Sequence, residues 1–395
     1  MAERVPDGQT EPTDPTEPTD PTEPTDRTRR WAQTMAGHVT TGPGEAELVR
    51  AHADSYRSIG GGPPLDRQAR EAREAELLRP GATLAHGAGS RATPEEPHAE
   101  RTCFERDRDR IVHSPAFRRL AGKTQVVVHP RDHERTRLTH ALEVAQVATS
   151  IARIVGANVA LTDAIALGHD CGHGPGGHAS EDAFDPYVAE GYDHGPWGAD
   201  VVLTSLNLCQ ETLDGIRNHS WSRPAPMTVE GEIVSWSDRI AYCAHDLEDA
   251  VHAGIVAETD LPTEVSAQVG PGRREQLSTF IGAVGRTVLE HGEVGMDSDT
   301  AGALAALRAF NYERIYTRPE SVAQSQSVIM VLQALVEFFA ADPGWLDEPD
   351  LDPNGPAALR AAVAYVGGMT DRYAFRTAVD QLGWDPTALP PTVGR

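Results

Sequence analysis

A histidine and an aspartate stand side by side, as His169 and Asp170, at the end of an apolar segment and before a glycine-rich turn. Residues 172–177 in this turn include four glycines and one proline, so the backbone can bend sharply and pass close to a ligand. His178 and Glu181 follow directly. Buried ionisable side chains need partners. The fold must therefore gather polar groups here, and a bound metal ion explains such a cluster better than a loop without chemistry.

Apolar residues recur at helical spacing along most of the chain, and no segment shows the clear alternation that is typical of a strand. The clearest helix is expected at residues 135–155. Further helices are expected at 45–59, 65–78, 101–125, 162–168, 178–188, 199–209, 211–217, 227–253, 273–292, 300–318, 319–341 and 356–382. Residues 126–129 are expected to form a short strand or an extended link. The sequence therefore predicts an all-α fold.

The chain is expected to have four parts. Residues 11–26 repeat Glu-Pro-Thr-Asp-Pro-Thr almost without change. Because this acidic, proline-rich composition opposes both helix formation and core packing, residues 1–30 are expected to form a disordered tail. Residues 31–100 are expected to be a mixed helical and irregular segment. Residues 101–260 carry the candidate site and form the expected core, with residues 261–395 as a helical region packed on it.

Composition and charge argue against several classes of protein. The 395-residue chain has no apolar run of about 18 residues and no apolar segment near its start, so we expect no membrane span, no secretion signal and a cytoplasmic location. Its four cysteines lack CxxC spacing and are expected to be free thiols. A formal charge of −24 argues against general nucleic-acid binding. Residues 101–137 nevertheless hold ten basic and five acidic residues, which suits an anionic ligand.

Four side chains from three segments have the donor atoms of a divalent-metal site: His140, His169, Asp170 and Asp238. Two imidazoles and two carboxylates suit Mn, Fe, Co, Ni, Zn or Mg without selecting among them. A single histidine on an apolar helix, such as His140, is more often a core residue, but the adjacent pair downstream favours the metal role. Such an ion can polarise a phosphoryl oxygen and acidify a water molecule.

Acid–base and phosphate-binding candidates accompany these residues. His178 and Glu181 are three positions apart on an expected helix, so the carboxylate can orient the imidazole and raise its basicity. Arg137, Arg239 and the arginines at 101–119 suit bidentate contacts to phosphate. One stripe of the helix expected at 227–253 carries four polar side chains: Asp238, Tyr242, His245 and Asp249. Together these residues indicate a metal-assisted phosphohydrolase.

Several segments resemble the deoxynucleotide triphosphohydrolases, the bacterial dGTPases and dGTPase-like proteins related to the animal SAM-and-HD enzyme. The order of the four metal candidates is similar to that of HD-domain phosphohydrolases in general. The flanking segments are more specific, and they are RDRDRIVHS at 106–114, AFRRL at 116–120, KTQV at 123–126, RTRLTH at 135–140 and DRIAY at 238–242. The likeness spans about residues 101–319, which is more than half of the chain.

This resemblance implies an HD-domain helical bundle with additional C-terminal helices, and hydrolysis of a dNTP at its α-phosphorus to deoxynucleoside and inorganic triphosphate. By motif position, the metal ligands are matched by His140, His169, Asp170 and Asp238. The catalytic positions are matched by His178, by Glu181 as its carboxylate partner, and by His194. The substrate positions are matched by Gln125, Arg137, Arg239, Tyr242 and Asp246. The resemblance also implies a homo-oligomer and, in some members, an allosteric nucleotide.

Two other functions stay open at this point. One is an HD phosphohydrolase that acts on a monophosphate or a signalling nucleotide, and the arginine-rich segment with Tyr242 and Asp246 favours a triphosphate over it. The other is a nucleotide-binding regulator without turnover. His178 and Glu181 argue against a regulator, because a protein that only binds has no need of an acid–base pair beside a metal.

Overall fold

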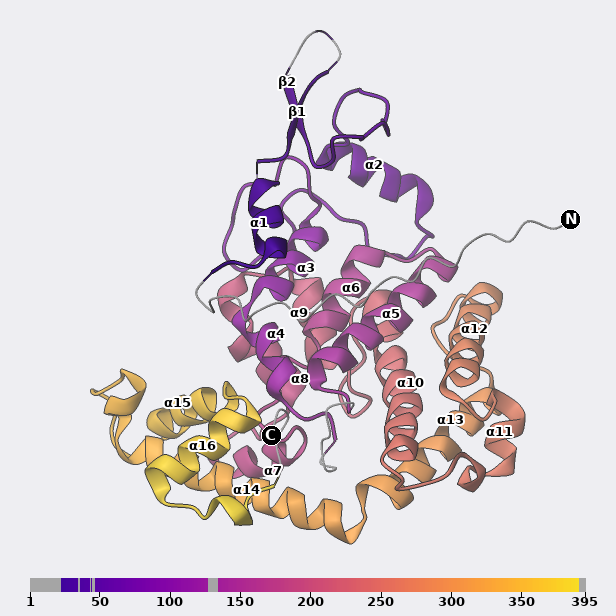
Figure 1. Cartoon of the computed structure of the whole chain (residues 1–395). Coiled ribbons are helices and arrows are strands. Elements are labelled where there is room, and N and C mark those ends of the chain that lie inside the picture. Colours follow the sequence, from indigo (N-terminus) through magenta and orange to yellow (C-terminus); the bar gives the residue numbers. More distant parts are fainter. Residues whose placement is uncertain (1–22, 35, 43, 45–46, 127–133, 391–395) are drawn as a thin grey trace, which may run out of the picture. The chain divides into compact units, whose positions relative to one another are not determined.

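The computed structural model describes residues 23–34, 36–42, 44, 47–126 and 134–390. Within these residues the chain forms sixteen α-helices and one two-stranded sheet, joined by short 3₁₀ and π turns (Figure 1). The predicted all-α fold is confirmed, with the small sheet as an addition. The chain divides into two compact units, Met1–Pro63 and Pro64–Arg395.

The described part of the first unit contains helix α1 (Asp26–Gln33) and strands β1 (His38–Thr41) and β2 (Glu47–Arg50). The strands pair antiparallel, and Val39 lies opposite Val49. The helix expected at 45–59 is therefore wrong over the residues of β2. Because the β-branched side chains of β1 give this segment a pairing partner, a hairpin competes successfully with a short isolated helix.

The predicted disordered tail ends earlier than expected. Thr25 caps helix α1 by accepting a hydrogen bond from the backbone of Thr28, so residues 26–30 are helical. Residues 1–22 of that tail lie outside the described residues, as do residues 127–133, which cover most of the link expected at 126–129.

The second unit holds the other fifteen helices described. The first five are α2 (Arg67–Leu77), α3 (Cys103–His113), α4 (Pro115–Arg119), α5 (Arg137–Val155) and α6 (Val159–Gly168). After the glycine-rich turn come α7 (Ala179–Phe184), α8 (His194–Trp197), α9 (Gln210–Asn218), α10 (Val229–His252) and α11 (Thr263–Val269). The last five are α12 (Arg273–His291), α13 (Ser298–Asn311), α14 (Pro319–Ala341), α15 (Pro356–Gly367) and α16 (Asp371–Leu382).

The larger hydrophobic core lies among α3, α5, α6, α9, α10 and α12. Helix α5 shows how the local sequence sets this arrangement. Thr136 caps its first turn, and Gly156 ends it in the left-handed conformation at φ 72°, which glycine adopts without strain. Its buried face packs against α6 and α10. This packing brings the polar side chains of α5 and α10 next to the end of α6.

A second hydrophobic core lies among α7, α14, α15 and α16. In Figure 1, α14 connects the region of α13 to the α15–α16 pair. Helix α14 is apolar and long enough to cross a membrane by length and composition, a test that the core helices of soluble proteins also pass. Its buried residues, among them Val331, Leu332 and Leu335, pack in this second core.

The structure refines several predicted helices. The helix expected at 356–382 is broken into α15 and α16, because Thr370 caps a new helix by accepting from the backbone of Tyr373. The segment expected to be helical at 199–209 forms only short π and 3₁₀ turns, and helix α11 was not predicted. These differences lie outside the elements that carry the candidate metal ligands.

Candidate metal and substrate site

A cavity of about 580 Å³ lies between α5, α10 and α14 in the second unit. This volume is within the range of roughly 300–1,000 Å³ that is typical of small-molecule sites. The predicted site residues that line the cavity are Gln125, Arg137, His140, Asp170, His178, His194, Asp238, Arg239, Tyr242 and Asp246. The other two, His169 and Glu181, lie against lining residues. The fold thus brings all twelve predicted residues together.

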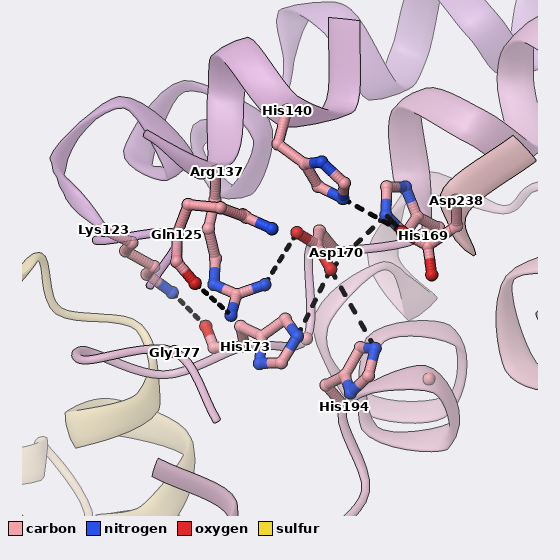
Figure 2. A network of polar contacts seen from close by, with 12 residues as sticks. Lys123, Gln125, Arg137, His140, His169, Asp170, His173, Gly177, His194 and Asp238 are labelled. Carbon is pink, nitrogen blue, oxygen red and sulfur yellow. Dashed lines mark hydrogen bonds and ion pairs between the residues drawn. The ribbon is translucent and has the colours of Figure 1, made fainter. Parts of the chain in front are cut away.

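Three elements place the first group of candidate ligands, as Figure 2 shows. His140 lies on α5, His169 follows the last residue of α6, and Asp238 lies on α10. Oδ1 of Asp238 is 3.0 Å from Nε2 of His140 and 3.7 Å from Nε2 of His169. Nδ1 of His169 is 2.6 Å from the carbonyl of Ala166. Since a carbonyl only accepts, this contact places a proton on Nδ1 and turns Nε2 toward the site.

Asp170 is buried beside this group and is held by a guanidinium. Its Oδ2 accepts a hydrogen bond from Arg137 at 2.8 Å, and its Oδ1 lies 3.2 Å from Nε2 of His173 (Figure 2). Burial alone would raise the pKa of Asp170, but Arg137 and His169 hold it well below its usual value. The carboxylate is therefore charged at neutral pH and available to a cation.

These residues fit a divalent cation. The ligand atoms of His140, His169 and Asp238 lie within 4.8 Å of one another. Within the described residues, Nε2 of His169 is buried without a hydrogen-bond partner. Such an atom is costly to bury unless a donor or a metal meets it. The mixed nitrogen and oxygen donors suit a divalent metal without selecting one.

The structure differs from the sequence prediction in the partner of Glu181. Its carboxylate accepts a hydrogen bond from Nδ1 of His194 instead of orienting His178. The ligand atom of His178, the N-cap residue of α7, lies within 4.8 Å of this carboxylate, but the hydrogen bond goes to His194. Nε2 of His194 in turn lies 3.0 Å from Nε2 of His219. The order of contacts is therefore Glu181, His194, His219.

The proton positions in this row follow from the contacts. Burial and the nearby positive charge of His194 lower the pKa of His219 to about 3, so this ring is neutral. Its Nδ1 donates to the carbonyl of Ile216 at 2.8 Å, which leaves Nε2 as an acceptor. Burial would also lower the pKa of His194, but the carboxylate of Glu181 raises it above its usual value. His194 is therefore an imidazolium that donates to both neighbours.

His178 is the imidazole that the cavity leaves accessible, since its side chain is exposed at the cavity wall. Although the ring is reachable, the surrounding protein and the charge of Arg137 lower its pKa to about 4. The ring is therefore neutral at pH 7 when no anion is present. A negatively charged ligand beside it raises the pKa again, so ligand binding and protonation of His178 are coupled.

Four residues of the site were missed by sequence reasoning: His173, His219, Arg308 and Tyr316. His173 contacts Asp170 and stacks on His194 with ring centroids 3.7 Å apart. His219 shares a pattern with His169, since each directly follows a helix and contacts the carbonyl three residues earlier. That pattern is visible in a sequence only once the helix ends are known.

The remaining missed residues support two predicted substrate positions. Nε of Arg308 donates to the hydroxyl of Tyr242 at 2.8 Å, and the hydroxyl of Tyr316 donates to Asp246 at 2.5 Å. Arg308 lies on α13 and Tyr316 in the turn after it, outside the segments that carry the sequence motifs. Both residues line the cavity with polar groups.

The raised pKa of Asp246 predicts that the stability of the protein depends on pH. Burial raises its pKa to about 7, against the opposing effects of its bond from Tyr316 and of nearby His140 and Arg135. The folded protein therefore holds this proton when the unfolded chain has lost it, and stability falls as pH rises from about 4 to 7. We expect Asp246→Asn, measured by urea unfolding, to gain on the order of 2–4 kcal/mol relative to the parent between pH 5 and 8.

The matched control is Asp299→Asn, whose side chain is exposed on α13. A difference between Asp246→Asn and the parent that stays constant with pH, like that of the control, would contradict the prediction.

Contacts with α15 and α16 fix two segments that border the cavity. Lys123, the single lysine of the chain, is buried and donates to the carbonyls of His173 and Gly367. The carboxylate of Asp371 accepts from the backbone of Thr124 at 2.9 Å and from that of Gly176 at 2.8 Å. The glycine-rich turn and the segment before Gln125 are thus fixed to the C-terminal helices.

Replacing Asp371 with alanine leaves two buried backbone donors without an acceptor. We expect Asp371→Ala to lower the free energy of unfolding by about 2–4 kcal/mol, measured by urea denaturation. Asp380→Ala is the matched control, because Asp380 lies exposed on the same helix in a surface ion pair with Arg376. Equal effects of the two substitutions would show that Asp371 does not support the glycine-rich turn.

Comparisons with known proteins agree with this geometry. Residues 137–243 match the HD domain and residues 294–379 match the phosphohydrolase-associated domain. A deoxyguanosinetriphosphate triphosphohydrolase-like protein of Caldanaerobacter subterraneus subsp. tengcongensis is 39% identical over 78% of this chain and 93% of its own length. The chain belongs to this dGTPase-like family. A second member, from Clostridium perfringens strain 13, is 38% identical over 71% of this chain and 86% of its own length.

Membership of the dGTPase-like family confirms the predicted resemblance and makes the protein a hydrolase of the HD phosphohydrolase type. The matched HD segment begins at Arg137 and ends just after Tyr242, so it contains all four candidate metal ligands. HD domains bind divalent metals, and the His and Asp groups of this dGTPase-like protein can hold one.

Proposed function

We propose that this dGTPase-like protein is a dNTP triphosphohydrolase that releases a deoxynucleoside and inorganic triphosphate. The observation that supports this most is the content of one cavity: candidate metal ligands, three arginines and a tyrosine–carboxylate pair that suits a sugar. The names of the relatives make dGTP the first substrate to test. The proposal includes a cytoplasmic location and a homo-oligomer, with an allosteric nucleotide as an expected activator.

The proposed roles follow from position and charge. His140, His169, Asp170 and Asp238 would hold a divalent metal, which supplies positive charge that polarises a phosphoryl oxygen. Arg137 and Arg239 bind the negative charge of the triphosphate, since guanidinium groups form bidentate contacts with phosphate. Tyr242 and Asp246 contact the sugar, and Gln125 distinguishes deoxyribose from ribose. The α-phosphate is thereby placed next to the histidine cluster.

His178 is the proposed general acid. It is neutral in the free enzyme, and the charge of the incoming triphosphate raises its pKa, which favours the protonated form in the substrate complex. Water attacks the α-phosphorus and the bond to the 5′-oxygen of the nucleoside breaks, with that oxygen taking the proton from His178. The oxygen of the attacking water stays on the triphosphate, and the proton that this water loses passes to solvent. The imidazolium of His194, held in place by Glu181, lies at the cavity wall beside the reacting phosphate.

The test uses the purified full chain with dATP, dCTP, dGTP and dTTP, each alone and mixed, with Mn²⁺ or Mg²⁺. GTP serves as the ribose control. We expect triphosphate and deoxynucleoside as products, resolved by ion-exchange chromatography. Pyrophosphate or orthophosphate would reject attack at the α-phosphorus and favour a different phosphohydrolase. Bound nucleotide without any product, in mixtures as well as alone, would favour a regulator.

A further inference from the structure

Arg239 differs from the other arginines of the cavity in what it contacts. Arg137 is paired with Asp170, and Arg308 donates to Tyr242. Among the residues that the structure describes, Arg239 has no carboxylate within ion-pair distance, and its Nε is buried without a hydrogen-bond partner. Its guanidinium carbon lies 3.5 Å from the centre of the Trp221 ring. An aromatic face therefore holds the charge of Arg239.

Trp221 is itself fixed in place. Its indole Nε1 donates to the carbonyl of Ser235 at 3.0 Å, which ties the ring to α10 one turn before Arg239. Its ring meets that of Trp236 edge to face, with centroids 4.7 Å apart. Trp221 also lines the cavity and is 45% exposed. An exposed tryptophan held on two sides is a rigid support for the guanidinium that lies on it.

The chemistry of this support suits an anionic ligand. A carboxylate in place of the ring would neutralise Arg239 and occupy its N–H groups, whereas a π-face attracts the cation and leaves its donors free. The net charge of the chain is −24, so an unneutralised guanidinium at the cavity wall is a local positive group that attracts a phosphate chain. The arrangement keeps a fixed, fully charged group ready at the cavity wall.

We propose that Trp221 is a positioning residue that holds Arg239 for the polyphosphate chain of the substrate. This inference rests on the proposed function, because it assigns Arg239 to the triphosphate. The ring acts through the guanidinium and not on the reacting atoms. Its loss should therefore weaken binding of the polyphosphate and raise KM, while kcat changes little.

The test is a double-substitution cycle on the full-length protein with its metal. Parent, Trp221→Ala, Arg239→Gln and the double variant are titrated with inorganic triphosphate by calorimetry. We expect Trp221→Ala to weaken binding about three- to tenfold in the parent and less than about twofold when Arg239 is already glutamine. Trp221→Phe, which keeps a π-face, should restore much of the loss. Trp345→Ala, at an exposed tryptophan outside the cavity lining, is the control.

Each outcome has one meaning, provided that thermal unfolding shows every variant folded. Equal losses in both backgrounds, or no loss from Trp221→Ala, overturn the positioning role. Coupled loss of triphosphate binding in a protein that hydrolyses no dNTP supports the positioning role and rejects the proposed activity. Hydrolysis to triphosphate with an unchanged KM in Trp221→Ala supports the activity and rejects the role of Trp221.

Discussion

Replacing His178 with alanine is expected to lower kcat by a factor of about 10² to 10⁴, the usual contribution of a positioned acid or base. The reason is the place of this ring. It is exposed to the cavity, whereas His173, His194 and His219 are buried and engaged with one another or with carboxylates. His178 is therefore the imidazole of this cluster that can reach a leaving oxygen.

The same substitution should leave the metal content unchanged, because His178 is not among the four candidate ligands. Steady-state kinetics with the substrate found in the product assay give kcat, and elemental analysis gives the metal content. His291→Ala is the matched control, since His291 is exposed at the end of α12, away from the cavity. A variant that keeps the parental kcat would remove His178 from the mechanism. Loss of the metal would instead make it a ligand, within the group formed with His173 and Glu181.

The parts of the site that could be predicted are those whose residues are near each other in sequence or follow a motif. The pair at 169–170 needs only the end of one helix, and His140 and Asp238 lie on two helices with strong apolar periodicity. Once α5, α6 and α10 pack around one core, these four side chains must converge. The convergence of these segments was therefore accessible from pattern and chemistry alone.

Partners that depend on tertiary geometry could not be predicted in this way. Glu181 was expected to pair with His178 from a spacing of three, but the carboxylate of Glu181 contacts His194 instead. Asp371 reaches the backbone of Gly176 across a sequence separation of 195 residues, which no local rule detects. Trp221 and Arg239 likewise meet only because α9 and α10 pack together.

The fold was predictable to a similar extent. Long periodic helices such as α5, α10 and α14 were located to within a few residues, because amphipathic or apolar faces decide them. The hairpin of β1 and β2 was missed, since strands of four residues carry too little alternation to outweigh helical propensity. The break between α15 and α16 depends on one threonine cap, and such boundaries are the least certain part of any pattern.

Replacing Asp238 with alanine is expected to remove the bound metal and to lower hydrolysis by more than about 10²-fold. This loss is larger than the usual loss when the replaced residue contacts a metal ligand but not the metal itself. Its Oδ1 is the atom that faces both His140 and His169, at 3.0 and 3.7 Å. Without it, two imidazoles remain with no carboxylate between them, and the affinity for a cation falls. Added Mn²⁺ should then raise the melting temperature of the parent but not of the variant.

The matched control is Asp299→Ala, an exposed carboxylate on α13 that should keep both the metal and the thermal shift. Treating the parent with a chelator should also abolish hydrolysis, and excess divalent cation should restore it. A variant that loses Asp238 but retains the full metal content would contradict the assigned ligand set. The ion would then belong to Asp170, His173 and His194, whose ligand atoms also lie within 4.8 Å of one another. Elemental analysis of Asp238→Ala beside His173→Ala separates the two arrangements, because each substitution depletes the metal in only one of them.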